Sequence, residues 1–244
     1  MDLQAILPML PLWYAVFLLS ATAHEAGHAA AARLGGDATA YLAGQASLNP
    51  FPHIVREPFG TVVVPILTFL MNGGQWMMGW ASAPYDASWE DRHPGRAAMM
   101  ALAGPAANLV LATIAFGVLW IGMSTGWWEP YLTPEGLLRF DRLVTPGPDG
   151  AHVFDGLSRL LSIALGLNTL LLVFNLLPIP PLDGATVVAG IVPPARRLRD
   201  AMRGSPIAAL AGLVAAWYLT GMLFRIVYLP VVRALFGVWG GPGS

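Results

Sequence analysis

The sequence predicts an all-α polytopic membrane protein. Of the 244 residues, 56% are hydrophobic and 11% are charged, and the mean hydropathy is +0.60. A soluble domain carries about 25% charged residues, so most of this chain is expected to lie within a lipid bilayer. Several apolar stretches also reach the roughly 20 residues that a helix needs to cross it. We expect a core of about three transmembrane helices plus a re-entrant segment, a small membrane-associated β element, and one or two C-terminal helices.

The N-terminal third is predicted to contain one crossing helix and one re-entrant segment. Residues 6–33 form the helix, which a Gly-Gly pair ends. Residues 37–49 are too polar to cross a membrane and show no helical stripe, so they are predicted to form short strands. Residues 61–80 are long enough to cross, but they contain a proline and the sequence Asn-Gly-Gly-Gln. These breakers predict two short segments that enter and return.

The rest of the chain is predicted to cross the membrane three or four more times. Residues 94–123 and 151–177 each form an apolar helix, and a short helix at 134–143 lies between them. Residues 193–205 are predicted to be a basic loop. Residues 207–239 are apolar but interrupted by an arginine and a proline, so they are predicted to form either one span plus a surface helix or two tilted segments.

Charge and cysteine content exclude some classes of function. The net charge of -1 gives no reason to expect a nucleic-acid partner, whereas a lipid bilayer is expected. The chain has no cysteine, so a disulfide framework and a thiolate metal site are both excluded. The N-terminus lacks the positive region and cleavage site of a signal peptide, so the first apolar segment is expected to stay in the mature protein.

A metal-ligand pattern, His-Glu-Ala-Gly-His at 24–28, lies in the second half of the first predicted helix. On a helix, His24 and His28 project from one face about one turn apart, which suits one tetrahedral zinc ion. Glu25 points about 100° away from His24, so it is poorly placed as a ligand but close enough to take a proton. Ionisable groups in a membrane-length apolar segment are costly, and this favours a functional role over core packing.

Asp183 is the candidate third ligand, since catalytic zinc sites usually take three protein ligands. It follows the apolar helix 151–177 and three prolines, which stop that helix and remove backbone donors. Gly184 then permits an unusual turn, so the carboxylate is expected to be presented from extended chain. The alternative is that Asp183 only caps a helix beginning at Ala185.

Joining Asp183 to the two histidines constrains the topology. The helices 6–33 and 151–177 must end on the same side of the membrane, so the chain between them crosses an odd number of times. Only 94–123 is an uninterrupted span, so 61–80 must enter and return on one face. The positive-inside rule then places the N-terminus outside and the metal in the cytoplasmic half. It groups these arginines on the cytoplasmic side: Arg33, Arg56, Arg92, Arg96, Arg196, Arg197, Arg199 and Arg203.

These motifs resemble those of the site-2 proteases, which are intramembrane zinc metalloproteases, and in particular the compact prokaryotic type. Residues 24–28 match the first family motif, and residues 175–184 match N-x-x-P-x-P-x-x-D-G at every fixed position. Weaker blocks follow in the family order: Phe59-Gly60, Gly79-Trp80-Ala81 and Ala103-Gly104-Pro105-Ala106-Ala107-Asn108. The resemblance covers roughly residues 10 to 190. It departs at 82–86, where relatives usually have a Lys-Pro-Val-Pro-like run, and there is no room for a PDZ domain.

The resemblance implies a protease core at 1–190, followed by a basic loop and C-terminal membrane helices at 191–244. It implies one Zn²⁺ per chain and hydrolysis of a peptide bond in or near a transmembrane segment of a substrate protein, as in regulated intramembrane proteolysis. The expected location is a prokaryotic inner membrane, with the active site toward the cytoplasm. The family analogy places Asn175 beside the site, holding substrate backbone or the oxyanion, and helix packing is the alternative.

The residues support this chemistry in their own right. Glu25 is expected to act as general base, while zinc polarises the scissile carbonyl. The predicted strands at 37–49 are expected to offer an edge to an unwound substrate. Two other functions use the same residues. One is a membrane metal transporter or sensor with a transit site here, and the other is a zinc hydrolase of a non-peptide substrate.

Overall fold

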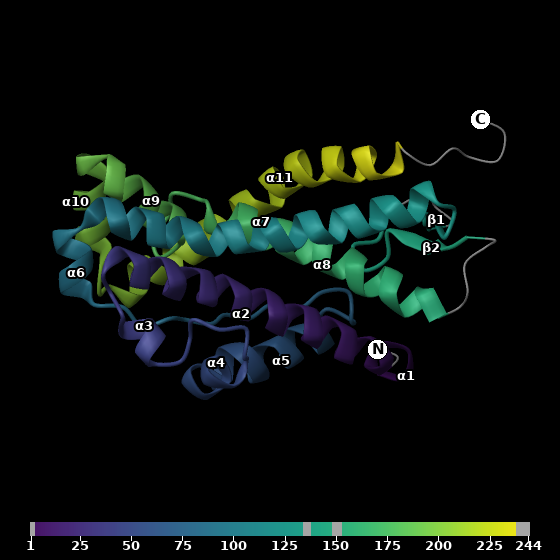
Figure 1. The fold of residues 1–244 in the computed structure, drawn as a ribbon, viewed down its shortest axis with the longest axis horizontal. Helices are drawn as coiled ribbons and strands as arrows, with labels where there is room; N and C mark the ends of the chain where they lie inside the picture. The colour runs from purple at the N-terminus through teal and green to yellow at the C-terminus, as the bar shows by residue number, and fades with distance from the viewer. Residues whose placement is uncertain (1–2, 134–137, 148–152, 238–244) are drawn as a thin grey trace.

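Long helices run along the molecule and form its body (Figure 1). The computed structural model describes residues 3–133, 138–147 and 153–237. Within these residues, four helices are long and apolar enough to cross a membrane. They lie within α2 (Leu10–Gly35), α7 (Pro94–Ser124), α8 (Val153–Asn175) and α11 (Pro206–Phe236). This confirms the predicted all-α polytopic class and a single C-terminal helix, which stays continuous through Pro230.

The direction of the helices agrees with the topology argument. In Figure 1, α2 and α8 run toward the end of the molecule that carries α6 (Ala87–Arg92) and α10 (Pro193–Met202), while α7 and α11 run away from it. α2 ends where Gly36 adopts a left-handed conformation with φ 100° and its N–H bonds to Ala32 and Arg33 carbonyls. α2 and α8 therefore end on the same side, as a shared metal site requires.

The re-entrant segment is confirmed. A π-helical turn, η2 (Phe59–Val63), leads into α5 (Val64–Met71), and residues 72–75 turn the chain. Residues 76–86 then return in extended form, with the Trp80 N–H bonded to the Gly60 carbonyl at 3.0 Å. The start of the segment at Gly60 and its end at Trp80 therefore lie side by side. Its tip is held to α11 by a Trp76–Trp217 stack with ring centroids 4.9 Å apart.

The strands predicted at 37–49 are wrong. This stretch contains a helical turn, α3 (Thr39–Leu42), followed by turns and by α4 (Phe51–Arg56). The cause is the Asp37 side chain, which binds backbone groups that a strand would need. Its carboxylate accepts hydrogen bonds from the Thr39 N–H at 2.9 Å and the Asp86 N–H at 2.8 Å. Burial raises the pKa of Asp37, but its hydrogen bonds to Thr39 and Asp86 outweigh burial and hold that pKa below its usual value.

The small β element lies elsewhere. β1 (Trp128–Pro130) and β2 (Val144–Pro146) pair antiparallel, with Glu129 opposite Thr145, at the end of the molecule away from α10. The described part of the predicted helix at 134–143 is not helical, and 134–137 lie outside the described residues. There the Leu143 N–H bonds to Ser162 Oγ at 3.0 Å, and Arg139 forks onto Asp141. These contacts replace helical hydrogen bonds.

The predicted basic loop at 193–205 is also wrong, because residues 193–202 form α10. Two prolines occupy its first positions, where their missing N–H groups cost nothing. Its arginines pair with carboxylates of α6, so the helix is held by partners distant in sequence. α9 (Asp183–Ile191), α10 and α6 together cover the end of the bundle where α2 and α8 finish.

Close packing of α2 on α7 depends on small residues. A Cβ added at Gly27 would lie 2.7 Å from the Ala103 carbonyl oxygen of α7, whereas one added at Gly117 of α7 would meet nothing within 4 Å. The first glycine is therefore needed for helix contact and the second is not.

We expect Gly27→Ala to destabilise the fold and Gly117→Ala to leave it unchanged. Overpacking against a backbone carbonyl costs about 1–3 kcal/mol, because α2 must move away from α7. Thermal unfolding of the detergent-purified variants measures this. Equal stability of the two variants would show that the approach of α2 to α7 is not limited by Gly27.

Candidate metal centre

α2 presents its two histidines to one point. His24 and His28 lie about one turn of helix apart. His24 is 8% exposed, and the two rings meet edge to face with centroids 4.6 Å apart. The two Nε2 atoms lie 3.0 Å from each other. The i, i+4 spacing therefore has the geometric effect predicted from the sequence.

Asp183 reaches the same point from another element. α8 ends at Asn175, the chain turns through the prolines, and Leu182 is extended with ψ 159°, so Asp183 begins α9. Its Oδ2 lies 3.1 Å from His24 Nε2 and 3.3 Å from His28 Nε2. A side chain on Gly184 would collide with the carbonyls of Leu176 and Leu177, which directly follow α8. Glycine is thus required for Asp183 to approach the histidines.

The three atoms that converge are all acceptors. His24 Nδ1 faces Asn108 Oδ1 at 2.7 Å, and His28 Nδ1 faces the Met100 carbonyl at 2.8 Å. Each Nδ1 therefore carries the proton, which leaves a lone pair on each Nε2. Asp183 Oδ2 is buried and has no hydrogen-bond donor among the described residues. Three acceptors at mutual distances of 3.0–3.3 Å need a cation between them.

These distances fit zinc. Zn–N and Zn–O bonds of about 2.0–2.1 Å at tetrahedral angles place neighbouring ligand atoms about 3.3 Å apart. Gly104 of α7 lies over the same point, since a Cβ there would fall 2.7 Å from His24 Nε2 and still closer to His28 Nε2. The missing side chain leaves the space that an ion would fill.

Glu25 lies beside this triangle with a free carboxylate. Its oxygen is within 4.8 Å of the histidine nitrogens, and it makes no hydrogen bond or ion pair with the described residues. It is 7% exposed and lines a cavity of about 630 Å³ that also contains His24, His28 and Asp183. Glu25 is therefore placed to exchange a proton with water in that cavity.

The cavity has one extended wall. Residues 79–85 line it, together with Leu213 of α11 and Asn175 at the end of α8. Among the described residues, the backbone groups of 81–85 have no hydrogen-bond partner. Asn175 donates Nδ2 to the Leu171 carbonyl of its own helix at 3.0 Å, and its oxygen is left unpaired within the described part of the chain.

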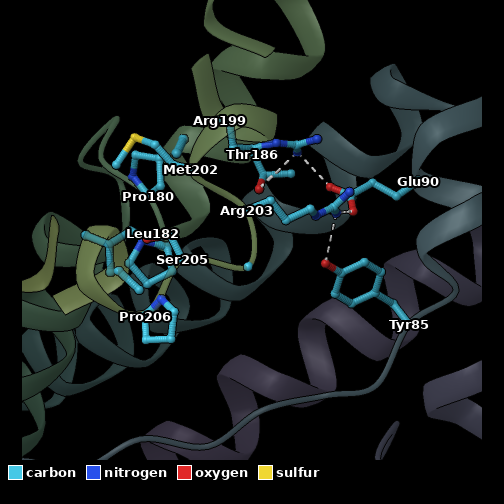
Figure 2. A pocket seen from close by; sticks show the side chains of 14 residues that line it. Tyr85, Glu90, Pro180, Leu182, Thr186, Arg199, Met202, Arg203, Ser205 and Pro206 are labelled. Atoms are coloured by element: carbon cyan, nitrogen blue, oxygen red, sulfur yellow. Dashed lines mark hydrogen bonds and ion pairs between the residues drawn. The ribbon is translucent and has the colours of Figure 1, made fainter. Parts of the chain in front are cut away.

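A second cavity, of about 400 Å³, adjoins the first and shares Pro181, Leu182 and Thr186 with it. Figure 2 shows its apolar side, formed by prolines and Met202, facing a rim of arginines. Arg199 and Arg203 both bind Glu90, which is only 3% exposed.

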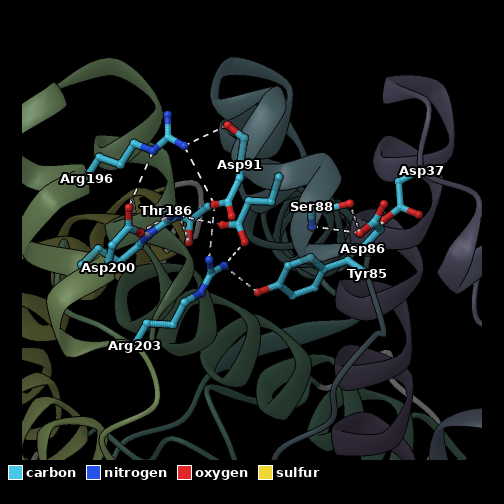
Figure 3. Close-up of polar contacts among 11 residues, drawn as sticks. Asp37, Tyr85, Asp86, Ser88, Asp91, Thr186, Arg196, Asp200 and Arg203 are labelled. Carbon is cyan, nitrogen blue, oxygen red and sulfur yellow. Dashed lines mark hydrogen bonds and ion pairs between the residues drawn. The ribbon is translucent and has the colours of Figure 1, made fainter.

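This ion-pair cluster joins α10 to α6 and to the extended wall (Figure 3). Arg196 and Arg203 also reach Asp91, and Arg203 donates to Tyr85 Oη at 3.3 Å. Burial lowers the pKa of Arg203, but the hydrogen bond to Tyr85 and the charge of Glu90 outweigh it and raise that pKa above its ordinary value. The cluster fixes α10 beside the metal cleft.

A polytopic helical body in which two histidines and an aspartate converge beside a free carboxylate is the arrangement expected of a membrane metallohydrolase. Comparison with known proteins agrees. Residues 13–219 match peptidase family M50. The chain is 32% identical over 194 residues to the Bacillus subtilis (strain 168) protein named Putative zinc metalloprotease YwhC, which covers 79% of this chain and 74% of that protein.

A second relative is the Mycobacterium tuberculosis (strain H37Rv) protein named Putative zinc metalloprotease Rip2. It is 30% identical over 213 residues, which are 87% of this chain and 70% of that protein. No solved structure matches the chain. The chain belongs to peptidase family M50, the site-2 protease family, and it is a zinc metalloprotease. This confirms the family, the enzyme class and the zinc cofactor expected from the motifs.

Sequence reasoning brought together His24, Glu25, His28 and Asp183, and the structure places them in one cavity. It missed the contact of Gly104 with His24 and His28, and it missed Glu90. Gly104 and Asn108 are four residues apart on α7, so both face α2, and this spacing was the available signal. Glu90 gave no signal, because its partners lie more than a hundred residues away.

We expect Gly104→Ala to reduce bound zinc without unfolding the protein. The added methyl group would fall against the Nε2 atoms of both histidines, where the ion is proposed to bind. Metal analysis of the purified variant measures the loss, and Gly95→Ala, whose Cβ would meet nothing within 4 Å, is the control. Full zinc content in Gly104→Ala would contradict this placement of the metal.

We expect Glu90→Gln to lower stability by about 3 kcal/mol, since it leaves two arginines without their buried partner. Asp200→Asn removes an exposed carboxylate from the same cluster and is the matched control. Thermal unfolding and limited proteolysis of α10 report the difference. Similar behaviour of both variants would show that the cluster does not hold α10.

Proposed function

We propose that this protein hydrolyses a peptide bond in or near a transmembrane segment of another membrane protein. The observation that carries the proposal is the triangle of three acceptor atoms, with edges of 3.0–3.3 Å, inside an apolar helical body. In this proposal His24, His28 and Asp183 hold one zinc ion per chain. A bound zinc ion supplies Lewis acidity that activates water and polarises a carbonyl.

Glu25 is the general base of the proposed reaction. Its carboxylate takes a proton from the attacking water and delivers it to the amine that leaves. The free position of the carboxylate supports this role, because a salt-bridged or hydrogen-bonded carboxylate would be a weaker base. Asn175 faces the same cavity, which supports a role in holding substrate backbone.

The substrate is proposed to bind in extended form along residues 81–85. A helix must unwind before a protease can reach its carbonyls, and the released backbone groups then need new partners. The predicted edge at 37–49 has no strand to offer. Residues 81–85 instead provide extended backbone without internal hydrogen bonds beside the metal ligands.

The transporter alternative has less support. A transit site needs polar groups that continue beyond the metal, but the next polar side chains along the bundle are fully buried and bonded to each other. Past them lies a closed apolar cluster that includes Trp13, Phe17 and Phe69. A non-peptide substrate is disfavoured by the family, whose matched relatives are named metalloproteases.

The active site is proposed to face the cytoplasm. Arginines gather at the ends of α2 and α6, at the start of α7 and along α10, all at the metal-proximal end of the molecule. Positive residues near the ends of spans favour the cytoplasmic side.

Zinc content and cleavage, measured together, test the proposal. We expect the detergent-purified wild type to hold about one zinc ion and to cut members of a panel of single-span membrane proteins. Glu25→Gln is expected to keep zinc and lose at least ~100-fold in rate, because only the proton acceptor is removed. Asp183→Ala is expected to lose both zinc and activity.

Two outcomes would contradict these assignments. Cleavage by Glu25→Gln at the wild-type rate would refute the general base. Full zinc in Asp183→Ala would refute the ligand set, and with it the topology derived from that ligand.

A further inference from the structure

We propose that Asn168 and Ser20 are positioning residues for the metal site. They fix the amide of Asn108 so that its oxygen faces His24, and this keeps the proton of His24 on Nδ1 and its Nε2 lone pair toward the metal. The inference rests on the zinc ligands proposed above but not on the identity of the substrate.

The orientation begins at two backbone carbonyls, which can only accept hydrogen bonds. Ser20 Oγ donates to the Val16 carbonyl at 2.7 Å, so its oxygen is left to accept. Asn168 Nδ2 donates to Ser20 Oγ at 2.9 Å and to the Ala164 carbonyl at 2.9 Å. These two bonds fix Asn168 Nδ2 toward Ser20 and the Ala164 carbonyl, so Asn168 Oδ1 points toward Asn108.

Asn168 in turn orients the amide of Asn108. Its Nδ2 donates to Asn168 Oδ1 at 2.9 Å and points its other hydrogen toward the Ser20 carbonyl at 3.4 Å. This leaves Asn108 Oδ1 facing His24 Nδ1 at 2.7 Å. An amide oxygen can only accept, so the imidazole must donate from Nδ1.

Burial prevents the Asn108 amide from turning over. Ser20, Asn108 and Asn168 are each at most 1% exposed, so water cannot supply the partners of a reversed amide. Turning Asn108 over would place Nδ2 against a protonated Nδ1 and leave an oxygen against Asn168 Oδ1. Each unsatisfied buried group costs about 1–3 kcal/mol.

The second histidine provides an internal comparison. His28 Nδ1 donates directly to the Met100 carbonyl, whose acceptor character cannot change. His24 has a side-chain amide in the equivalent place, and an amide presents either an acceptor or a donor according to its orientation. Only the His24 ligand therefore needs the relay through Asn108, Asn168 and Ser20.

The test is zinc affinity of the full-length protein in detergent, measured by competition with a chelator. Asn168→Leu is expected to weaken zinc about 10–100-fold, the usual loss when an outer hydrogen bond of a metal ligand is removed. Thr169→Val is the matched control. It removes a buried hydroxyl from the next position of α8, where Thr169 bonds only to its own helix, and it should leave affinity unchanged.

A second background separates positioning from packing. In Asn108→Asp, both carboxylate oxygens are acceptors, so the side chain can accept from His24 Nδ1 in either orientation. Asn168→Leu should then cost little zinc affinity in the Asn108→Asp background, although it costs much in the wild type. Equal losses in the two backgrounds would overturn the proposal, because a packing defect does not depend on the chemistry at position 108.

Two further variants keep the test decisive. If Asn168→Leu does not assemble, Ser20→Ala makes the same comparison with a smaller change in volume, and the same loss only in the wild-type background is expected. Asp183→Ala is measured alongside. If Asp183→Ala retains zinc, the ligand set is refuted. If Asp183→Ala loses zinc but Asn168→Leu and Ser20→Ala bind it with unchanged affinity, only the relay is refuted.

Discussion

The structure depends on one constraint, which is that polar groups inside a bilayer must find partners within the protein. Four buried polar side chains, Ser20, His24, Asn108 and Asn168, meet at one level and bond to each other across α2, α7 and α8. Apolar helix faces in lipid gain little by choosing one register over another, since lipid tails are as apolar as leucine. Hydrogen bonds of 2.7–2.9 Å between Ser20, His24, Asn108 and Asn168 select a single register.

That register explains how Asp183, which is distant in sequence, reaches the two histidines. His24 lies past the middle of α2, and Asp183 comes after α8 has ended, so the two meet only if α8 stops at the right depth beside α2. The polar contacts set the depth, and the prolines after Asn175 end the helix there. Small residues complete the arrangement, because Gly27 and Gly104 let α7 approach α2 closely enough for Asn108 to touch His24.

The parts predictable from sequence were those with local causes. The spacing of His24 and His28 follows from helix geometry, the re-entrant segment from its internal breakers, and the order of crossings from the need to unite the ligands. The predictions that proved wrong concern segments whose hydrogen-bond or ion-pair partners are distant in sequence. Asp37 turns its segment away from strand formation by binding Asp86, and α10 is a helix because Glu90 and Asp91 hold its arginines. A single asparagine in an apolar helix, such as Asn168, likewise gives no local sign of which groups it will bind.

The extended wall at 81–85 raises the same constraint at the site itself. Its backbone groups have no partner within the described residues, and they lie beside an apolar cleft. Such groups are tolerated at membrane depth where they line a water-filled cavity, so we expect the cavity of about 630 Å³ to be hydrated. Hydrolysis needs that water as a reactant. An unwound substrate strand could replace the water along the wall one hydrogen bond at a time, which would offset much of the cost of opening its helix. In the proposed function, the unpaired wall and a hydrated metal site follow from one requirement, because cutting a peptide bond within a membrane needs both water and free backbone partners.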